Sequence, residues 1–313
     1  SSGMSSADTS ASTSASTETA SGRNSAISML NAAKPRKMPL PATAAIRSPD
    51  GERGCRTADT FNIWREHQVT QSAVAWVLAC TFVRFAEDTG LLPTPRLSGP
   101  GDALRRARDA FGEFVRQRPT DHERHYLEAV FDGLAEFPAL TGLFGRAHNP
   151  LFAMPPSYEA ARDLLAFWQQ TDPDSGALRH DFSDPDLDTR FLGDLYQDLS
   201  EAARKRYALL QTPEFVEEFI LDRTLEPAIR TFGLDGIRLI DPTCGSGHFV
   251  LGAFQRLLDH WQRSAPGLDA RERVMKALEG VYGVDLNPFA VAIARFRLLV
   301  AALQASGIRT LRE

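Results

Sequence analysis

The sequence Asp241-Pro242-Thr243-Cys244-Gly245-Ser246-Gly247-His248-Phe249 separates a predicted strand from a predicted helix. Residues 236–240 before it form a short apolar run typical of a buried strand, and residues 250–258 after it have the apolar spacing of an amphipathic helix. An acid and a small glycine turn at such a junction mark the place where open α/β sheets bind nucleotides and nucleoside-like cofactors. Gly245 and Gly247 allow a tight turn and leave room for a ligand against the backbone. Free N–H groups at the start of the helix lie beside this turn.

A second strand and helix follow further along the chain. Residues 280–287 are predicted to form a strand that ends in the acid Asp285, and residues 289–300 form an apolar helix. Pro288 suits the first turn of that helix, where no backbone N–H is needed. A carboxylate at the end of a second strand accepts hydrogen bonds from the two ribose hydroxyls of an adenosine-type ligand. The order of strand, glycine turn, helix, strand and acid therefore predicts a mononucleotide-binding half.

The spacing of the glycines and the acid excludes two common phosphate-binding patterns. The dinucleotide fingerprint needs a third glycine three residues after the second and an acid about 20 residues further on. Here the third glycine, Gly252, comes late, and Asp285 is much too distant. The phosphate loop needs a Gly-Lys-Ser/Thr sequence, which does not follow. S-adenosylmethionine has an amino acid end, a sulfonium and an adenosine, and its binding needs no pyrophosphate contact.

The sequence of residues 241–249 resembles motif I of the amino-methylating DNA methyltransferases, and residues 282–288 resemble the motif that follows it. The resemblance implies an α/β fold in which a helical N-terminal domain precedes the first part of a Rossmann-like, S-adenosylmethionine-dependent methyltransferase sheet. It implies S-adenosylmethionine as the cofactor. The residues implied to bind it are Thr212, Pro213, Asp241, Pro242, Cys244, Gly245, Ser246, Gly247, Phe249, Asp285, Leu286 and Asn287.

The segment upstream of the glycine turn supports the same family. Residues 191–199 contain a Gly-x-x-Tyr-x-x-Leu pattern, and Thr212-Pro213 follows. In adenine methyltransferases of the modification-and-restriction type, such a helix and a Thr-Pro turn precede motif I, and the turn opens a helix over the methionine end of the cofactor. Thr212 suits a helix N-cap and Pro213 the first helical position. This motif order is typical of the subclass in which the catalytic motif comes after the cofactor motifs.

The remaining chain divides into a tail and a helical region. Residues 1–58 are rich in Ser, Thr and Ala and are predicted to be a disordered tail and linker, because they cannot bury enough apolar surface. Residues 59–188 are predicted to form a helical domain, with helices over residues 69–88, 103–116, 121–136 and 158–170. Gly90 is expected to end the first of these. Residues 189–313 are assigned to the start of the methyltransferase domain, which is incomplete here.

Composition sets further bounds. The formal net charge of −5 shows no overall basic footprint for nucleic acid. The cysteines Cys55, Cys80 and Cys244 are scattered and lack the spacing of a metal site, and a reducing, cytoplasmic setting fits them. Cys244 is expected to be a small packed side chain. The longest apolar run, residues 73–83, is too short to span a membrane, and no stretch is expected to reach that length.

The helical region has its own resemblance. Residues 64–71 and 83–92, the latter containing Glu-Asp-Thr-Gly-Leu-Leu, are similar to the amino-terminal part of the PglX family. These are adenine-specific DNA methyltransferases of phage-growth-limitation and bacteriophage-exclusion (BREX, second subtype) systems. The resemblance implies double-stranded DNA as a partner, through parts absent here, other phage-defence proteins as possible partners, and no membrane. It implies methyl transfer to the exocyclic N6 amine of adenine, within a system akin to restriction and modification.

One expected part of such an enzyme is missing from the sequence. These enzymes grip the amine with an Asn/Asp-Pro-Pro-Tyr/Phe/Trp motif, whose aromatic ring stacks on a flipped base. No such motif follows Asp285. We therefore expect an amino-terminal portion of a methyltransferase that binds cofactor weakly, does not methylate DNA alone, and has a poorly stable cofactor half. The alternative is a non-catalytic module that docks a partner protein and uses the cofactor half as a scaffold. A nicotinamide-dependent enzyme is a distant third hypothesis.

Overall fold

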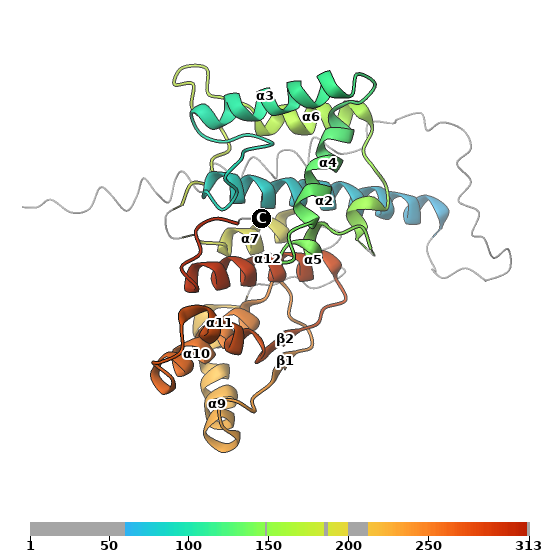
Figure 1. Ribbon diagram of the computed structural model, residues 1–313. Coiled ribbons are helices and arrows are strands. Elements are labelled where there is room, and N and C mark those ends of the chain that lie inside the picture. Colours follow the sequence, from blue (N-terminus) through green and yellow to red (C-terminus); the bar gives the residue numbers. More distant parts are fainter. Residues whose placement is uncertain (1–59, 148, 185–186, 200–211, 312–313) are drawn as a thin grey trace, which may run out of the picture.

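The computed structural model describes residues 60–147, 149–184, 187–199 and 212–311. This part of the chain is mostly helical, with one small sheet of two parallel strands. Figure 1 shows an upper group of helices around α2 (Phe61–Asp88) and a lower group that carries the sheet, with α12 (Pro288–Ala305) between them. The tail predicted for residues 1–58 lies outside the described residues, as does Cys55.

Helix α2 is the centre of the upper group. The sequence predicted a helix over residues 69–88 that is apolar on most faces, and this is confirmed, although α2 begins earlier, at Phe61. From Val74 to Glu87 every side chain is buried, as expected for a helix surrounded by others. The helix ends at Asp88, and Gly90 follows with a φ of 76°. The predicted role of Gly90 in ending the helix is therefore confirmed.

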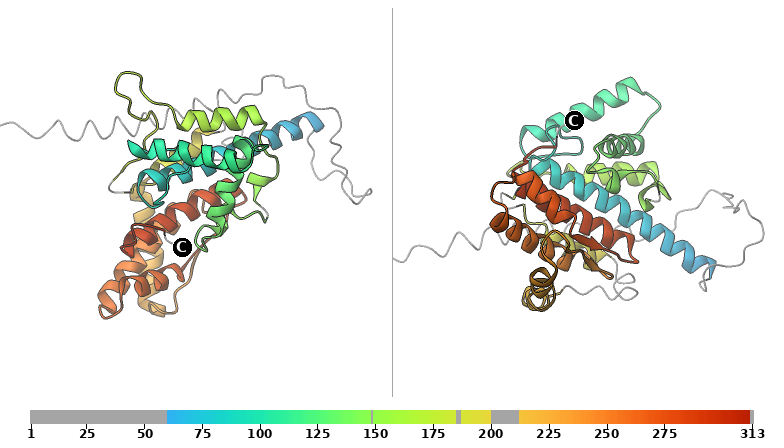
Figure 2. Two further views of the ribbon diagram at one scale, coloured as in Figure 1. Left: turned by 45° about the horizontal axis from the view of Figure 1, so that its top comes forward. Right: turned by 60° about the horizontal axis from the view of Figure 1, so that its bottom comes forward.

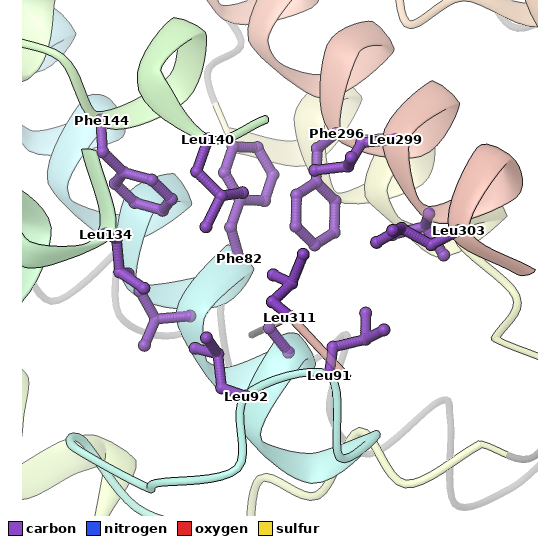
Figure 3. A pocket seen from close by; sticks show the side chains of 13 residues that line it. Phe82, Leu91, Leu92, Leu134, Leu140, Phe144, Phe296, Leu299, Leu303 and Leu311 are labelled. Atoms are coloured by element: carbon purple, nitrogen blue, oxygen red, sulfur yellow. The ribbon is translucent and has the colours of Figure 1, made fainter. Parts of the chain in front are cut away.

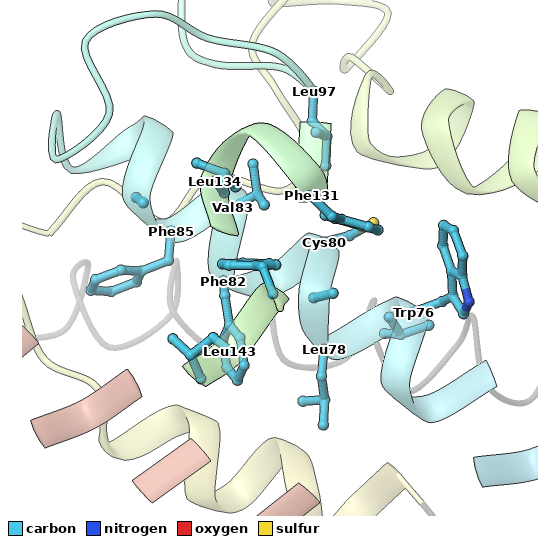
Figure 4. Packing of buried hydrophobic residues seen from close by; sticks show 14 of the residues in the cluster. Trp76, Leu78, Cys80, Phe82, Val83, Phe85, Leu97, Phe131, Leu134 and Leu143 are labelled. Carbon is cyan, nitrogen blue, oxygen red and sulfur yellow. The ribbon is translucent and has the colours of Figure 1, made fainter. Parts of the chain in front are cut away.

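The other helices of the upper group pack against α2 or against one another. They are α3 (Asp102–Gln117), α4 (Glu123–Ala135), α5 (Thr141–Phe144), the 3-10 turn η1 (Pro150–Phe152), α6 (Tyr158–Trp168) and α7 (Arg190–Leu199). Helix α3, for example, packs against α4. Helices α3, α4 and α6 confirm the predicted helices to within two residues at each end. Figure 4 shows Val83 of α2 close to Leu134 of α4, and Phe82 of α2 close to Leu143 of α5, in the resulting core.

An ionic cluster at the end of α2 is buried in this core. The Glu87 carboxylate accepts hydrogen bonds from three consecutive backbone N–H groups, those of Arg96, Leu97 and Ser98. The Arg84 guanidinium contacts Glu87 at 3.0 Å and Asp88 at 2.7 Å, and the side chains of all three are fully buried. Buried charges are tolerated when they are paired and hydrogen-bonded. The Glu-Asp-Thr-Gly-Leu-Leu sequence therefore joins α2 to the loop that follows it.

The lower group contains the sheet and three helices. These are α9 (Glu214–Phe232), β1 (Leu239–Asp241), α10 (His248–Ser264), α11 (Ala270–Leu278) and β2 (Val281–Gly283). Strands β1 and β2 run parallel, with Leu239 paired to Val281 and Asp241 paired to Gly283. The strand–turn–helix order predicted around residues 241–249 is confirmed. The observed strands are shorter than predicted, and β1 is shifted toward Asp241.

The expectation that the first strand is buried is wrong. Ile240 is 62% exposed, and Tyr282, its partner in β2, is 50% exposed. Helix α10 covers the face of the sheet to which the buried Val281 points, whereas the side chains of Ile240 and Tyr282 point to the other face. A strand of apolar residues is buried on both sides only where helices cover both faces of its sheet. In the described part of the chain, helices cover one face of this sheet.

Helix α12 belongs to both groups. Its Phe296 ring stacks on Phe82 of α2 with centroids 4.4 Å apart, and Ala302 lies in the core of the lower group. Figure 2 shows α12 running alongside α2 in both views. A pocket at this junction is lined by apolar side chains of α2, α12 and the segment after each, together with side chains from α4 and α5. They include Phe82, Phe144, Phe296 and Leu311 (Figure 3). The domain boundary predicted near residue 189 remains a prediction.

Two helices, α2 and α12, are longer and more apolar than the sequence was expected to allow. By length and composition alone, α2 and α12 are long and apolar enough to span a membrane, although the sequence was expected to contain no such stretch. In the folded chain, 78% of the most apolar window of α2 and 50% of that of α12 are buried. The core of the upper group thus accounts for the apolar character of α2.

Candidate functional site

The candidate site lies where the two strands end. Strands β1 and β2 are parallel, so the segments that follow Asp241 and Gly283 leave the sheet at the same edge. Two backbone hydrogen bonds join these segments: the N–H of Val284 donates to the Asp241 carbonyl at 2.9 Å, and the N–H of Cys244 donates to the Val284 carbonyl at 3.0 Å. The glycine turn of residues 242–247, which we call the glycine loop, is therefore held against the segment that carries Asp285.

Two glycines of the loop have backbone conformations that favour glycine. Gly245 has a φ of 54° and Gly247 a φ of 88°, both in the left-handed region. Gly247 is also the N-cap of α10, and a Cβ there would lie 2.9 Å from the Cβ of Ala294 in α12. The predicted need for glycine thus has one cause at Gly245, the turn itself, and two at Gly247, the turn and the close approach of α12.

Asp285 closes the glycine loop. One of its carboxylate oxygens accepts the N–H of Gly245 at 2.9 Å, and the other accepts the N–H of Asn287 at 2.8 Å. The side chain is partly exposed. The structure thus brings together two residues that were predicted for the site and that lie 40 positions apart.

Asp241 and Cys244 contact nearby parts of the site. The Asp241 carboxylate accepts the N–H of Thr243 at 3.0 Å, while Pro242 is exposed. Cys244 is buried against Gly283, where an added Cβ would lie 3.0 Å from its sulfur. Burial, with the carboxylates of Asp241 and Asp285, raises the pKa of the Cys244 thiol to about 11. Cys244 is therefore a neutral, packed side chain at neutral pH, as the sequence predicted.

The residues after Asp285 have different surroundings. Asn287 is 1% exposed and is the N-cap of α12, where its side-chain oxygen accepts the N–H of Phe289 at 3.0 Å. Pro288 occupies the first turn of α12, as predicted. Leu286 is 94% exposed, and Phe249 is partly buried against the core of the lower group. Asn287 therefore shapes the backbone, whereas Leu286 is free to meet a ligand.

The Thr-Pro turn starts helix α9, but not in the predicted register. Pro213 is the N-cap of α9, and Thr212 lies one residue before it, so the assignment of Thr212 as N-cap and Pro213 as first helical residue is wrong by one position. The carbonyl of Pro213 accepts the N–H groups of Val216 and Glu217 at 2.9 and 3.2 Å. Proline is acceptable there because the first N–H groups of a helix have no partner within it.

Glu217 connects α9 to the helix of the glycine loop. A Cβ at Gly252 of α10 would overlap Oε1 of Glu217, so the late third glycine serves close packing of α9 on α10. Burial raises the pKa of the Glu217 carboxyl, and the guanidinium of Arg297 opposes that rise. The first turns of α9 thus lie near α10, and the Pro213 carbonyl binds N–H groups of α9 itself.

Arg297 belongs to the site, although it was not among the residues predicted for it. This arginine of α12 is 5% exposed, and its Nη1 donates a hydrogen bond to the Ser246 carbonyl in the glycine loop at 2.8 Å. A buried charged residue within a largely apolar helix needs a partner. The arginine among the apolar residues of 288–305 could have been noticed in the sequence. Its partner could not, because Ser246 lies about 50 positions away.

Comparison with known proteins agrees with this geometry. Residues 229–310, which contain both strands, the glycine loop and α12, match the family model of the MmeI DNA-methyltransferase domain. Over 267 residues the chain is 56% identical to the adenine-specific methyltransferase PglX of Streptomyces coelicolor. The chain is PglX-like. The alignment covers 82% of this chain and 22% of that PglX, so the chain spans about a fifth of its length.

A second relative shares a shorter segment. Over 85 residues, or 26% of this chain and 7% of the relative, the chain is 36% identical to a Methanocaldococcus jannaschii protein whose assigned name joins a type II restriction enzyme and a methyltransferase. Together with the matches to PglX and the MmeI domain, this similarity relates the chain to the DNA methyltransferases. The family resemblance inferred from the glycine loop and from residues 64–92 is thereby confirmed.

Proposed function

We propose that this chain supplies the S-adenosylmethionine-binding part of an adenine-specific DNA methyltransferase. The observation that carries the proposal is the hydrogen bond from the Gly245 N–H to the Asp285 carboxylate at the shared edge of β1 and β2. It joins a glycine turn and an acid at the place where α/β sheets bind nucleoside-like ligands. In this proposal the two strands and their helices are the first part of a Rossmann-like methyltransferase sheet.

The residues present fit such a cofactor. Each oxygen of Asp285 accepts one backbone N–H, and an ionised carboxylate offers about four acceptor sites. Acceptor capacity therefore remains for two ribose hydroxyls. Apart from Gly245 and its two chain neighbours, no described residue has an atom within 4 Å of the place where a Cβ at Gly245 would stand, so one side of the loop is open. When bound, S-adenosylmethionine supplies an electrophilic methyl group.

In this proposal the residues of the chain hold and orient the cofactor. Asp285 accepts the ribose hydroxyls, and the glycine loop lies against the amino acid end, with Leu286 and Phe249 supplying apolar contacts. Asp241 orders the turn through Thr243. Thr212, Pro213 and the start of α9 are proposed to cover the methionine end.

The substrate and the cellular setting extend the proposal. We infer methyl transfer to the N6 amine of adenine in double-stranded DNA, within a phage-defence system of the phage-growth-limitation or BREX kind, in the cytoplasm and with other defence proteins as partners. None of the 313 residues forms the Asn/Asp-Pro-Pro-Tyr/Phe/Trp motif that grips the amine. Binding of the base is therefore assigned to parts of a longer protein, as the coverage of PglX allows.

Isothermal titration calorimetry tests whether the chain binds the proposed cofactor. We expect weak, saturable binding of S-adenosylmethionine and S-adenosylhomocysteine, and no comparable binding of a nicotinamide dinucleotide or ATP. Preference for the nicotinamide dinucleotide would establish the nicotinamide-dependent alternative. A folded chain that binds none of these ligands would favour the non-catalytic module.

Transfer of a tritiated methyl group to DNA tests whether the chain can methylate without the missing motif. We expect the 313-residue chain to leave unmethylated DNA unlabelled, because nothing recognisable in it holds the adenine. Substantial labelling by the purified chain would contradict the assignment of base binding to other parts.

A further inference from the structure

Helix α12 carries two arginines that point to opposite sides. Arg295 and Arg297 are two residues apart, which places them about 200° apart around a helix. Arg295 is exposed, and its Nη1 donates to the Gly142 carbonyl in α5 at 3.1 Å. Arg297 is buried, and its Nη1 donates to the Ser246 carbonyl at 2.8 Å. One arginine therefore attaches α12 to the upper group, and the other attaches it to the glycine loop.

The surroundings of Arg297 compensate its charge. The guanidinium is buried, so it needs hydrogen bonds and an opposite charge. The Ser246 carbonyl is one partner, and the Glu217 carboxylate of α9 interacts electrostatically with it. Arg297 thus lies where α9, α12 and the glycine loop meet.

The peptide unit that Arg297 contacts needs to be held. It joins Ser246 to Gly247, and glycines on both sides of Ser246 offer little steric resistance to rotation of the backbone. In the structure this peptide is fixed at both ends: Arg297 binds its carbonyl, and its N–H, that of Gly247, donates to the Cys244 carbonyl at 2.8 Å. Without Arg297, one of these two restraints would be lost.

The other side of α12 is anchored in the core of the upper group. Phe296, the residue between the two arginines, stacks on Phe82 and meets Phe85 edge-to-face with centroids 5.6 Å apart. Ala294 lies directly against Gly247 of the loop. A shift of α12 would therefore disturb the aromatic core and the glycine loop together.

We propose that Arg297 is a positioning residue for S-adenosylmethionine: it fixes the Ser246–Gly247 peptide and so couples the helical core, through α12, to the shape of the glycine loop. The inference rests on the proposed function, because that loop is the part assigned to the cofactor. It goes beyond that function in naming a residue that does not contact the ligand, and in giving the helical region a role in cofactor binding.

Two matched pairs of variants test the proposal: Arg297→Met with Arg295→Met, and Arg297→Lys with Arg295→Lys. The first readout needs no ligand and is hydrogen–deuterium exchange of the amides of residues 243–249 in the full chain. Loss of one hydrogen bond from a charged donor is expected to speed their exchange about tenfold in Arg297→Met. Arg295→Met is expected to match the wild type, and Arg297→Lys to fall between, because lysine keeps a charged donor but not the planar fork.

The second readout is the dissociation constant of S-adenosylmethionine. We expect it to rise about tenfold in Arg297→Met, to recover in part in Arg297→Lys and to be unchanged in Arg295→Met. Equal exchange and equal affinity in the two methionine variants would overturn the proposal. If Arg297→Met does not fold, the lysine pair decides by the same comparison. If the wild type binds no cofactor, the proposed function fails, and the exchange rates still decide whether Arg297 holds the loop.

Discussion

The backbone N–H of Gly245 donates a hydrogen bond to the carboxylate of Asp285, 2.9 Å away and 40 residues further along the chain. Strand β2 places Asp285 beside the glycine loop, because β2 runs parallel to β1 and both end at the same edge. The second carboxylate oxygen accepts the N–H of Asn287, at the start of α12. One side chain thus orders the glycine loop and the entry to α12 together.

Replacement of Asp285 by alanine is expected to weaken binding of S-adenosylmethionine. The change removes a charged acceptor from the loop and from the proposed ribose contact, which corresponds to a loss of about tenfold to a hundredfold in affinity. Calorimetric titration measures this loss. Asp259→Ala is the matched control, since Asp259 is exposed and its ion pair with Arg263 is long, at 3.8 Å. Equal affinities in the two variants would contradict the role of Asp285.

Replacement of Gly247 by alanine is expected to destabilise the fold. Its φ of 88° costs any other residue about 1–2 kcal/mol, and the new Cβ would press on Ala294. Gly112→Ala is the control, because Gly112 lies inside α3 with no described atom within 4 Å of an added Cβ. That change should stabilise the protein by about 0.5–1 kcal/mol. Urea denaturation of both variants gives the two free energies of unfolding, and a shift of the same sign in both would refute this account.

Replacement of Glu87 by alanine is expected to destabilise the helical core strongly. It would leave the backbone N–H groups of residues 96–98 and the buried Arg84 guanidinium without their carboxylate. Breaking a buried ion pair in this way costs about 3–5 kcal/mol. Glu113→Ala is the surface counterpart, since Glu113 pairs with Arg116 in solvent, and we expect no measurable change in the unfolding midpoint. A small effect of Glu87→Ala would show that the loop is held by other contacts.

Replacement of His180 by phenylalanine is expected to reduce the loss of stability in acid. His180 is 3% exposed and stacks on Phe167 with centroids 4.0 Å apart, and neither ring nitrogen has a hydrogen-bond partner among the described residues. Burial, with the charges of Arg84 and Arg179, lowers the pKa of His180 to about 4. The unfolded chain therefore binds more protons between pH 6.5 and 4. The contribution of His180 to stability is therefore fully present above pH 6.5 and is lost as the pH falls toward 4.

The measurement is urea denaturation of His180→Phe and the wild type at pH 7.5 and pH 5. On going from pH 7.5 to pH 5, the free energy of unfolding of the variant should rise by about 1–2 kcal/mol relative to that of the wild type. Asp88 acts in the opposite direction, because burial raises its pKa to about 6 despite the nearby Arg84. The difference between variant and wild type, rather than the wild-type slope, therefore reports His180. A pH-independent difference would show that His180 does not titrate as described.

Local patterns predicted the elements around the site well. The glycine loop between β1 and α10, the acid that follows β2 and the proline that starts α12 all follow from short-range spacing. The apolar faces of α2 were also predicted, because burial on all sides leaves no polar stripe. The start of α9 was misplaced by one residue, since Thr-Pro fits two neighbouring registers at a helix start.

Longer-range features could not be predicted in this way. Ile240 and Tyr282 have the apolar character of buried strand residues, yet both are at least half exposed, because burial depends on what covers the sheet. The partner of Arg297 lies in a turn about 50 residues upstream, and no periodicity relates the two positions. The stability of the lower group without further strands remains a prediction, which limited proteolysis would test.

The amino-acid sequence by itself determined the order of strand, glycine loop, helix, strand and acid, and with it the family, because turns, caps and apolar periods are local properties of the chain. Only the tertiary structure decided that Asp285 reaches the Gly245 N–H and that Arg297 holds the Ser246 carbonyl. It also decided that α12 serves both cores. These relationships depend on the packing of distant segments, because the entropic cost of bringing residues 40 or more positions apart together is met by the whole folded chain and not by a local pattern.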